Sequence, residues 1–137
     1  MNQNARDVVL AFVEAINRQN PAEMEKLMSE DHLFVDSRDT HCQGLETMIA
    51  GWKDYFGMFP DYCVTIDTIL SDGDLVAAFG RAFGTFNGRR GLVPENRIEM
   101  PAAWRARVKD GKITYWQVYA DWTEGVRIIE EDEKTGG

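Results

Sequence analysis

The sequence predicts a single α+β domain in which N-terminal helices cover one face of a curved antiparallel sheet. Two observations predict this class: apolar residues recur at helical spacing as far as residue 59, and strand-like alternation broken by turn dipeptides fills the remainder. The 137 residues are enough for one domain with its own core. We assign residues 1–125 to this domain and residues 126–137, which include four consecutive acidic residues, to a solvated C-terminal tail.

Three helices are expected in the first half of the chain. The first carries an apolar face with helical spacing, made by Val9, Phe12, Val13 and Ile16. The second begins at residues 20–23, Asn-Pro-Ala-Glu, which combine a capping residue, a proline at the first helical position and a glutamate three residues after the cap. A short strand over 33–36 precedes the third helix, which ends at Pro60. Its apolar face consists of Leu45, Met48, Ile49, Trp52, Phe56 and Phe59.

Four strands are expected at 62–70, 75–86, 97–108 and 112–122. Asp72-Gly73, Asn87-Gly88 and Asp110-Gly111 lie between them and tolerate the positive φ of tight hairpins. One face of the 75–86 strand is almost entirely alanine and glycine, which indicates sharp curvature or the close approach of another group. Either tryptophans of the neighbouring strands or a ligand would occupy the space beside that face.

The composition argues against several classes of partner. A net charge of -8 repels phosphate backbones and anionic lipids, so neither nucleic acid nor a membrane is expected as a partner. Cys42 and Cys63 have no metal-ligand spacing and are expected as reduced thiols. No signal peptide or nucleotide-binding fingerprint is visible, so we expect a cytoplasmic protein without a metal or cofactor.

Residues 59–85 (FPDYCVTIDTILSDGDLVAAFGRAFGT), the GLVP loop and the 110–121 hairpin (DGKITYWQVYAD) resemble SnoaL-like proteins. These proteins are similar to ketosteroid isomerases and belong to the nuclear transport factor 2-like superfamily. The resemblance covers roughly residues 5–125. It implies a cone-shaped α-β barrel, in which a mixed sheet wraps around the N-terminal helices, and a homodimer formed through the convex sheet face. The superfamily contains cyclases, isomerases, hydrolases, dehydratases and non-catalytic binding domains, so the fold alone does not define a reaction.

The resemblance to ketosteroid isomerases places Asp36 at the position of their catalytic base. Phe12, and Trp104 or, with a shifted hairpin, Ala103, stand where those enzymes have their oxyanion donors, so ordinary steroid isomerase activity is not expected. The acid and base positions of limonene-epoxide hydrolases hold residues that cannot activate water: Ala82, Gly80 and Val118. The catalytic aspartate of SnoaL-type cyclases falls on Ala120, and the neighbouring Asp121 is expected to point away from the cavity.

Two interpretations of Asp36 stay open at this point. It is a general base in apolar surroundings, or it is a strand-end aspartate that binds the turn after it or pairs with Arg38. His32 has the spacing to share the strand face of Asp36 and could be its acid–base partner, although structural histidines are the more ordinary outcome. The predicted ligand contacts are mostly aromatic: Phe12, Phe34, Trp52, Tyr55, Phe56, Trp104, Trp116 and Val118.

The sequence therefore predicts a small-molecule-binding protein whose ligand is apolar and bears a carbonyl group. Our first hypothesis is a cofactor-independent isomerase, cyclase or dehydratase that uses Asp36 as its base. The alternative is a binding or dimeric accessory module that lacks the oxyanion donors. In a third possibility the tryptophans fill the cone. The opposite sheet face alternates arginines with aromatic residues, which suits a homodimer interface: Arg81, Arg105, Arg107, Phe79, Phe83 and Tyr119.

Overall fold

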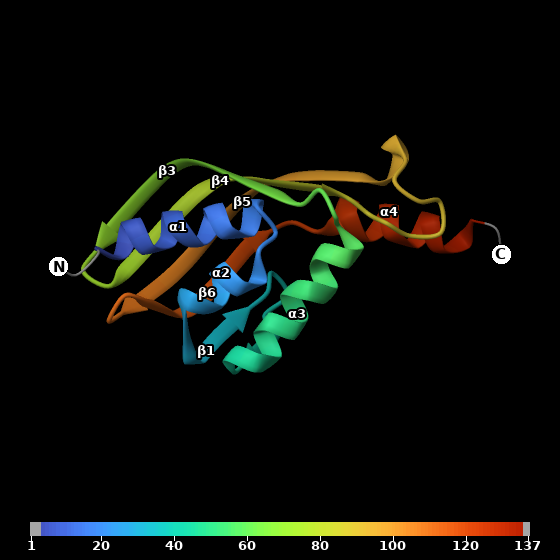
Figure 1. Cartoon of the computed structure of the whole chain (residues 1–137). Helices are drawn as coiled ribbons and strands as arrows, with labels where there is room; N and C mark the ends of the chain where they lie inside the picture. Colours follow the sequence, from blue (N-terminus) through green and yellow to red (C-terminus); the bar gives the residue numbers. More distant parts are fainter. Residues whose placement is uncertain (1–3, 136–137) are drawn as a thin grey trace.

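The computed structural model describes residues 4–135 (Figure 1). Six strands form one open, curved sheet in the order β2-β1-β6-β5-β4-β3. β1 pairs in parallel with β6, and all other pairs are antiparallel. The strands are β1 (Met28–Val35), β2 (His41–Gln43), β3 (Cys63–Asp72), β4 (Leu75–Thr85), β5 (Arg97–Lys109) and β6 (Lys112–Ala120). This mixed sheet confirms the predicted α+β class.

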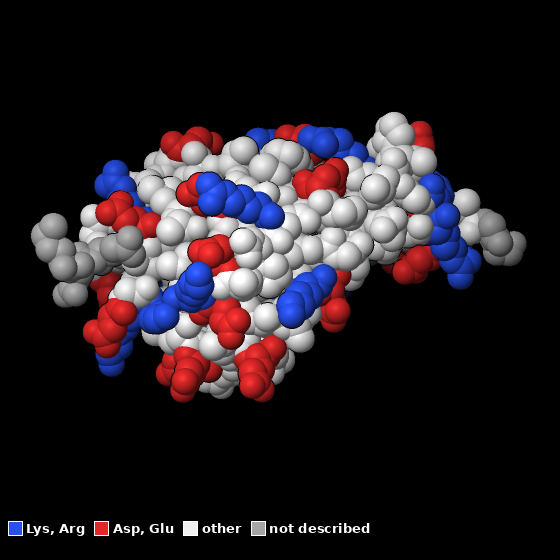
Figure 2. Space-filling model, viewed as in Figure 1, with Lys and Arg blue, Asp and Glu red and all other residues white. Residues whose placement is uncertain are grey.

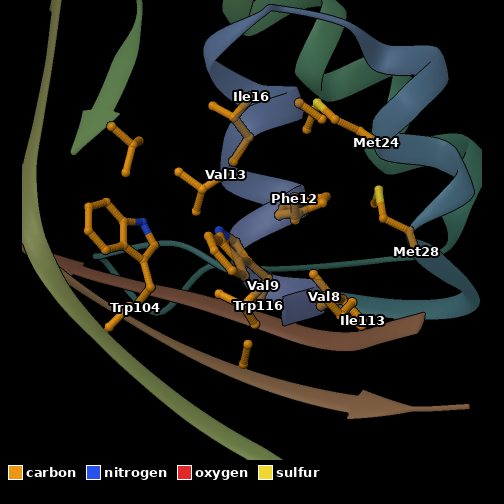
Figure 3. Packing of buried hydrophobic residues seen from close by; sticks show 14 of the residues in the cluster. Val8, Val9, Phe12, Val13, Ile16, Met24, Met28, Trp104, Ile113 and Trp116 are labelled. Atoms are coloured by element: carbon orange, nitrogen blue, oxygen red, sulfur yellow. The ribbon is translucent and has the colours of Figure 1, made fainter. Parts of the chain in front are cut away.

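Helix α1 (Ala5–Asn17) lies in the concave face of the sheet (Figure 1). Its buried face includes Phe12, whose ring centroid lies 4.9 Å from that of Trp116. In Figure 3, Trp104 rises from β5 towards Val13 of this helix. The amide side chain of Asn17 bonds to both backbone groups of Val64 at 2.8 Å, which fixes the end of α1 against β3.

Helices α2 (Pro21–Lys26) and α3 (Leu45–Met58) follow the predicted signals closely. The side-chain oxygen of Asn20 accepts the backbone N–H of Glu23 at 3.2 Å, which confirms the predicted cap of α2. α3 turns Met48, Trp52 and Phe56 inward and stops just before Pro60. It stands beside β1 and covers the part of the sheet that α1 does not reach (Figure 1).

Two of the three predicted hairpin turns are confirmed. Gly73 has φ 62° in the β3–β4 turn, and Asp110 and Gly111 have φ 51° and 75° in the β5–β6 turn. Asn87-Gly88, the third turn signal, forms no tight hairpin. It begins the connection between β4 and β5, whose 89–96 link is longer than a hairpin turn, as its Gly91 and Pro94 predict, and includes the 3₁₀ turn η1 (Pro94–Asn96). Two backbone N–H groups of this connection, those of Arg89 and Arg90, bind a side chain of the last helix.

That last helix corrects a second expectation. Residues 123–134 form α4 (Thr123–Lys134), so the solvated tail expected over 126–137 is wrong for its described part. Ile128 packs into a cluster with Phe59 and Ile98. Asp132, 1% exposed, accepts the backbone N–H groups of Arg89 (2.7 Å) and Arg90 (2.8 Å). Charge alone suggested solvation, but apolar residues at helical spacing within the acidic segment give α4 a buried face.

The alanine–glycine stripe of β4 has two separate causes. A Cβ on Gly80 would lie 1.8 Å from the carbonyl oxygen of Thr65, because the β3–β4 register shifts between Ile66 and Thr68. Ala78 is the cross-strand partner of Trp104 and leaves room for the indole. The absence of a side chain at Gly80 therefore leaves room for the bulged backbone of β3, and the short side chain of Ala78 leaves room for the indole of Trp104.

Charged groups of both signs are spread over the viewed surface (Figure 2). Acidic side chains outnumber basic ones along the lower edge of that view, around β1 and the beginning of α3. In residues 4–135, no helix combines the length and the apolar character needed to cross a membrane.

Candidate functional site

A cavity of about 680 Å³ lies between α3, the concave face of the sheet and α4. Its wall is mostly apolar and includes all four tryptophans of the chain. The aromatic residues on this wall are Phe34, Trp52, Tyr55, Tyr62, Trp104, Trp116 and Trp122. The tryptophans therefore border an open space and do not fill it.

The pairing register of the central strands places the residues of the cavity wall next to one another. Trp104 of β5 is the partner of Val118 on β6, and Phe34 of β1 is the partner of Trp116. Because side chains alternate along a strand, these residues share the concave face. Ala82 borders the cavity opposite Met100, its partner on β5, and its short side chain leaves part of the space open.

Asp36 follows the last residue of β1 and borders the cavity. Its Oδ1 accepts the backbone N–H groups of Arg38 and Thr40, both at 2.9 Å. In the described part of the chain no hydrogen bond reaches its Oδ2. The two interpretations made from the sequence are therefore compatible: one oxygen holds the turn after β1, and the other has no hydrogen-bond partner among the described residues.

The other charged groups at the cavity come from two segments. Arg38 belongs to the turn after β1, while Glu130 and Glu133 belong to α4. Together with Asp36 they give the lining three carboxylates and one guanidinium. Arg38, Glu130 and Glu133 are exposed, Asp36 is half-buried, and the rest of the wall carries no charged side chain.

Three of the predicted site residues do not border the cavity: His32, Phe12 and Phe56. His32 is 0% exposed, and its Nδ1 lies 2.7 Å from the carbonyl oxygen of Ile113, to which it donates. Burial lowers the pKa of His32, which favours the neutral ring, and its Nε2 has no partner. His32 is thus a core histidine that ties β1 to β6, and the structure does not place it as a partner of Asp36.

Phe12 and Phe56 stand behind the tryptophans of the wall. The ring of Phe12 lies 6.3 Å from Trp52 and 4.9 Å from Trp116, and the ring of Phe56 lies 5.5 Å from Trp52. They hold these indoles in place and do not themselves reach the cavity. The other predicted contacts, Phe34, Trp52, Tyr55, Trp104, Trp116 and Val118, do border it.

Sequence reasoning missed Tyr62, Trp122 and the contribution of α4. Tyr62 precedes the first residue of β3, and its ring centroid lies 4.9 Å from that of Tyr55 in an edge-to-face arrangement. Burial raises the pKa of Tyr62 to about 12 and raises that of Tyr55 well above its ordinary value, so both phenols are neutral at physiological pH. The sequence signal that could have identified Tyr62 is its position two residues before the buried Val64, which places both side chains on the same face of the chain.

Asp121 is exposed and does not border the cavity, in line with the strand offset. Its Oδ1 accepts the backbone N–H of Thr123 at 2.9 Å and the hydroxyl of the same residue at 2.6 Å, at the beginning of α4. Within residues 4–135, no group of three His, Cys, Asp or Glu side chains is arranged to hold a metal ion.

A family model, the SnoaL-like domain, matches residues 9–116. No curated protein matches the chain. Among solved structures, the chain is similar to a protein with a ketosteroid isomerase-like fold from Catenulispora acidiphila, crystallised with trimethylamine. The TM-score is 0.77 and the identity is 23%, over 88% of this chain and 90% of that one.

Two further similar structures are proposed polyketide cyclases. One, a SnoaL-like protein from Shewanella denitrificans, has a TM-score of 0.80 and 16% identity over 93% of this chain and 97% of that one. The other, IdmH from Streptomyces antibioticus, has a TM-score of 0.77 and 23% identity over 93% of this chain and 99% of that one. At these identities the similarity demonstrates the shared fold alone.

Proposed function

The chain belongs to the SnoaL-like domain family, and on this premise we propose that it binds a small, largely apolar molecule with a carbonyl group and acts on it without a cofactor. Asp36 is the general base, and the reaction is an isomerisation, cyclisation or dehydration. The observation that carries this proposal is a carboxylate with one unbonded oxygen at the edge of an aromatic cavity.

The geometry supports a base in this position. The two backbone N–H groups on Oδ1 hold the carboxylate in one orientation, so Oδ2 can accept a substrate proton without a large rearrangement. The cavity volume lies within the range of about 300–1,000 Å³ that suits small organic ligands. Its tryptophans would exclude water and orient a ring system by stacking.

A second candidate function is binding without catalysis. It is favoured by the absence of a donor at Phe12, which lies in the core, and by the use of one Asp36 oxygen in a turn. A protein of this kind would retain the aromatic cavity and release its ligand unchanged.

A deuterium-exchange experiment tests the proposal and separates the two candidates. The protein is incubated with 2-tetralone in D₂O, and NMR follows deuterium entering the carbon next to the carbonyl. We expect wild-type catalysis, and for Asp36→Asn a loss of about 10²–10⁴-fold with unchanged melting temperature and 2-tetralone affinity. Asparagine keeps the Oδ1 acceptor and therefore the turn.

Asp39→Asn is the matched control, because Asp39 lies in the same turn, is exposed and does not border the cavity. Its φ of 65° is one that asparagine tolerates. Full exchange activity in Asp36→Asn would remove the catalytic assignment. Binding of 2-tetralone without exchange in the wild type would favour the non-catalytic module.

We also propose a homodimer through the convex face of the sheet, and a cytoplasmic location. Phe79 and Tyr119 are 43% and 42% exposed on this face. The guanidinium of Arg105 lies 5.9 Å from the centroid of the Tyr119 ring, an arrangement suited to a protein interface. Light scattering should give twice the chain mass for the wild type. The double variant Phe79→Glu/Tyr119→Glu should give the mass of the monomer, and a monomeric wild type would contradict the dimer.

The proposed cytoplasmic location rests on the cysteines, which are both free, in keeping with a reducing compartment.

A further inference from the structure

Two tyrosines from different segments meet at the end of the cavity nearest α4. Tyr55 comes from the last turns of α3, and Tyr62 from the loop between α3 and β3. The two rings are edge to face with their centroids 4.9 Å apart, and burial raises the pKa of both phenols, so both stay protonated. Both residues border the cavity. The hydroxyls of the pair are therefore polar groups on an otherwise apolar stretch of the cavity wall.

The pair has hydrogen-bonding capacity left over. A phenol donates one hydrogen bond and accepts up to two, so a mutual bond leaves one O–H free. Among the described residues, no backbone group and no other side chain bonds to either hydroxyl. The side chains packed around the pair, Phe59, Met100 and Trp122, offer no oxygen or carboxylate acceptor. A ligand oxygen at this point would supply the missing partner.

The tyrosine pair and Asp36 belong to different segments that border the cavity. Asp36 follows β1 and Tyr62 precedes β3, and the sheet order places β6, β5 and β4 between these two strands. Tyr55 instead belongs to α3, which packs beside β1; its ring lies 6.0 Å from that of Trp52, which is itself 6.4 Å from the ring of Phe34 on β1. The pair therefore offers a polar contact at a point of the wall separate from the turn of Asp36.

We propose that Tyr55 and Tyr62 form a subsite that binds a neutral hydroxyl or carbonyl oxygen of the ligand at a point of the cavity wall separate from Asp36. The preferred ligand then carries a second oxygen in addition to the carbonyl next to the reacting carbon. A charged group is disfavoured here because the surrounding side chains are apolar and would strip its hydration. The inference rests on the proposed function only in that the cavity binds a ligand.

A matched pair of probes, 2-phenanthrol and phenanthrene, tests this subsite. They differ by one hydroxyl, and tryptophan quenching reports their affinities because four indoles border the cavity. We expect the wild type to bind 2-phenanthrol roughly 3- to 10-fold more tightly than phenanthrene, the ratio that one neutral hydrogen bond supplies. In Tyr55→Phe/Tyr62→Phe this ratio should fall to about one, with phenanthrene affinity unchanged.

Two controls accompany these variants. Tyr119→Phe removes an exposed hydroxyl on the other face of the sheet and should keep the wild-type ratio. Asp36→Asn should also keep it, so loss of the catalytic assignment and loss of the subsite are distinguishable. An equal affinity of the wild type for both probes, or an undiminished ratio in the double variant, would overturn the proposal.

A measurement on the wild type keeps the test independent of variant folding. With ¹³C at the phenol carbon of tyrosine, two of the four tyrosine resonances should shift with 2-phenanthrol and not with phenanthrene. Identical shifts with both compounds would contradict a hydrogen bond to the pair.

Discussion

The interior of this domain has a filled end and a hollow end, built from the same kinds of side chain. Under α1, Phe12 packs in one buried cluster with Val8, Val9 and Ile113, and none of these residues borders the cavity (Figure 3). Beyond Ile16 the helix ends, and α3 and α4 stand over the sheet without filling the space between them. Aromatic content therefore does not distinguish a core from a cavity wall; what distinguishes them is whether a helix lies directly over the strand face.

Removing Asp132 is expected to have the largest effect, because this carboxylate fixes α4, the wall that closes the hollow end. Asp132→Ala leaves the N–H groups of Arg89 and Arg90 and the Asn96 amide without their acceptor. We expect the melting temperature to fall by on the order of 10 °C and ligand affinity to fall with it. Glu131→Gln, an exposed change on the same helix, should be nearly neutral; equal losses in both variants would contradict the anchor.

Two alanines on the same face of β4 test the comparison directly. Ala78 is buried, pairs with Trp104 and does not border the cavity, so Ala78→Leu should overpack and cost about 1–3 kcal/mol in the free energy of unfolding. Ala82 borders the cavity, so Ala82→Leu should leave stability nearly unchanged and weaken phenanthrene binding. Denaturant titrations and quenching measure these outcomes. If both variants were equally destabilised, the hollow end would have to be as tightly packed as the filled one.

Acid should loosen the hollow end before the filled end. Burial raises the pKa of Asp132, but hydrogen bonds from Asn96 and from the N–H groups of Arg90 and Arg89 outweigh it, so the pKa lies below its ordinary value. A lowered folded-state pKa stabilises the fold above the unfolded value of about 4, and this stability is lost as pH falls further. Hydrogen exchange at decreasing pH should detect α4 opening first. The same pH dependence in Asp132→Asn would exclude this carboxylate as its cause.

A smaller effect on stability than that of Asp132→Ala is expected at the other aspartate, Asp36. Asp36→Ala removes two turn hydrogen bonds at a partly exposed position, so we expect a loss of about 1 kcal/mol. Thermal melts of Asp36→Ala and Asp132→Ala compare the two aspartates. Asp36 borders the cavity and has one oxygen without a hydrogen bond, whereas both oxygens of Asp132 accept hydrogen bonds within the fold. Equal destabilisation would contradict that distinction.

Local signals in the sequence predicted much of the secondary structure. The cap at Asn20, the turns at Gly73 and at Asp110-Gly111, and the helix stop before Pro60 each depend on residues within a few positions of one another. The prediction failed where a distant partner decided the outcome. The connection after Asn87 and the helix at the C-terminus depend on one contact, from Asp132 to the backbone of Arg89 and Arg90, across more than 40 residues.

By itself, the sequence determined the α+β class, the order of most elements, the SnoaL-like family and the position of Asp36 at the end of a strand. Only the tertiary structure decided that Trp104 borders a cavity while Phe12 and His32 lie in the core, and that Tyr62 joins Tyr55 on its wall. The reason is physical: periodicity encodes which face of an element is apolar. The volume left between two apolar faces depends on how far apart the packed elements stand, which no local pattern records.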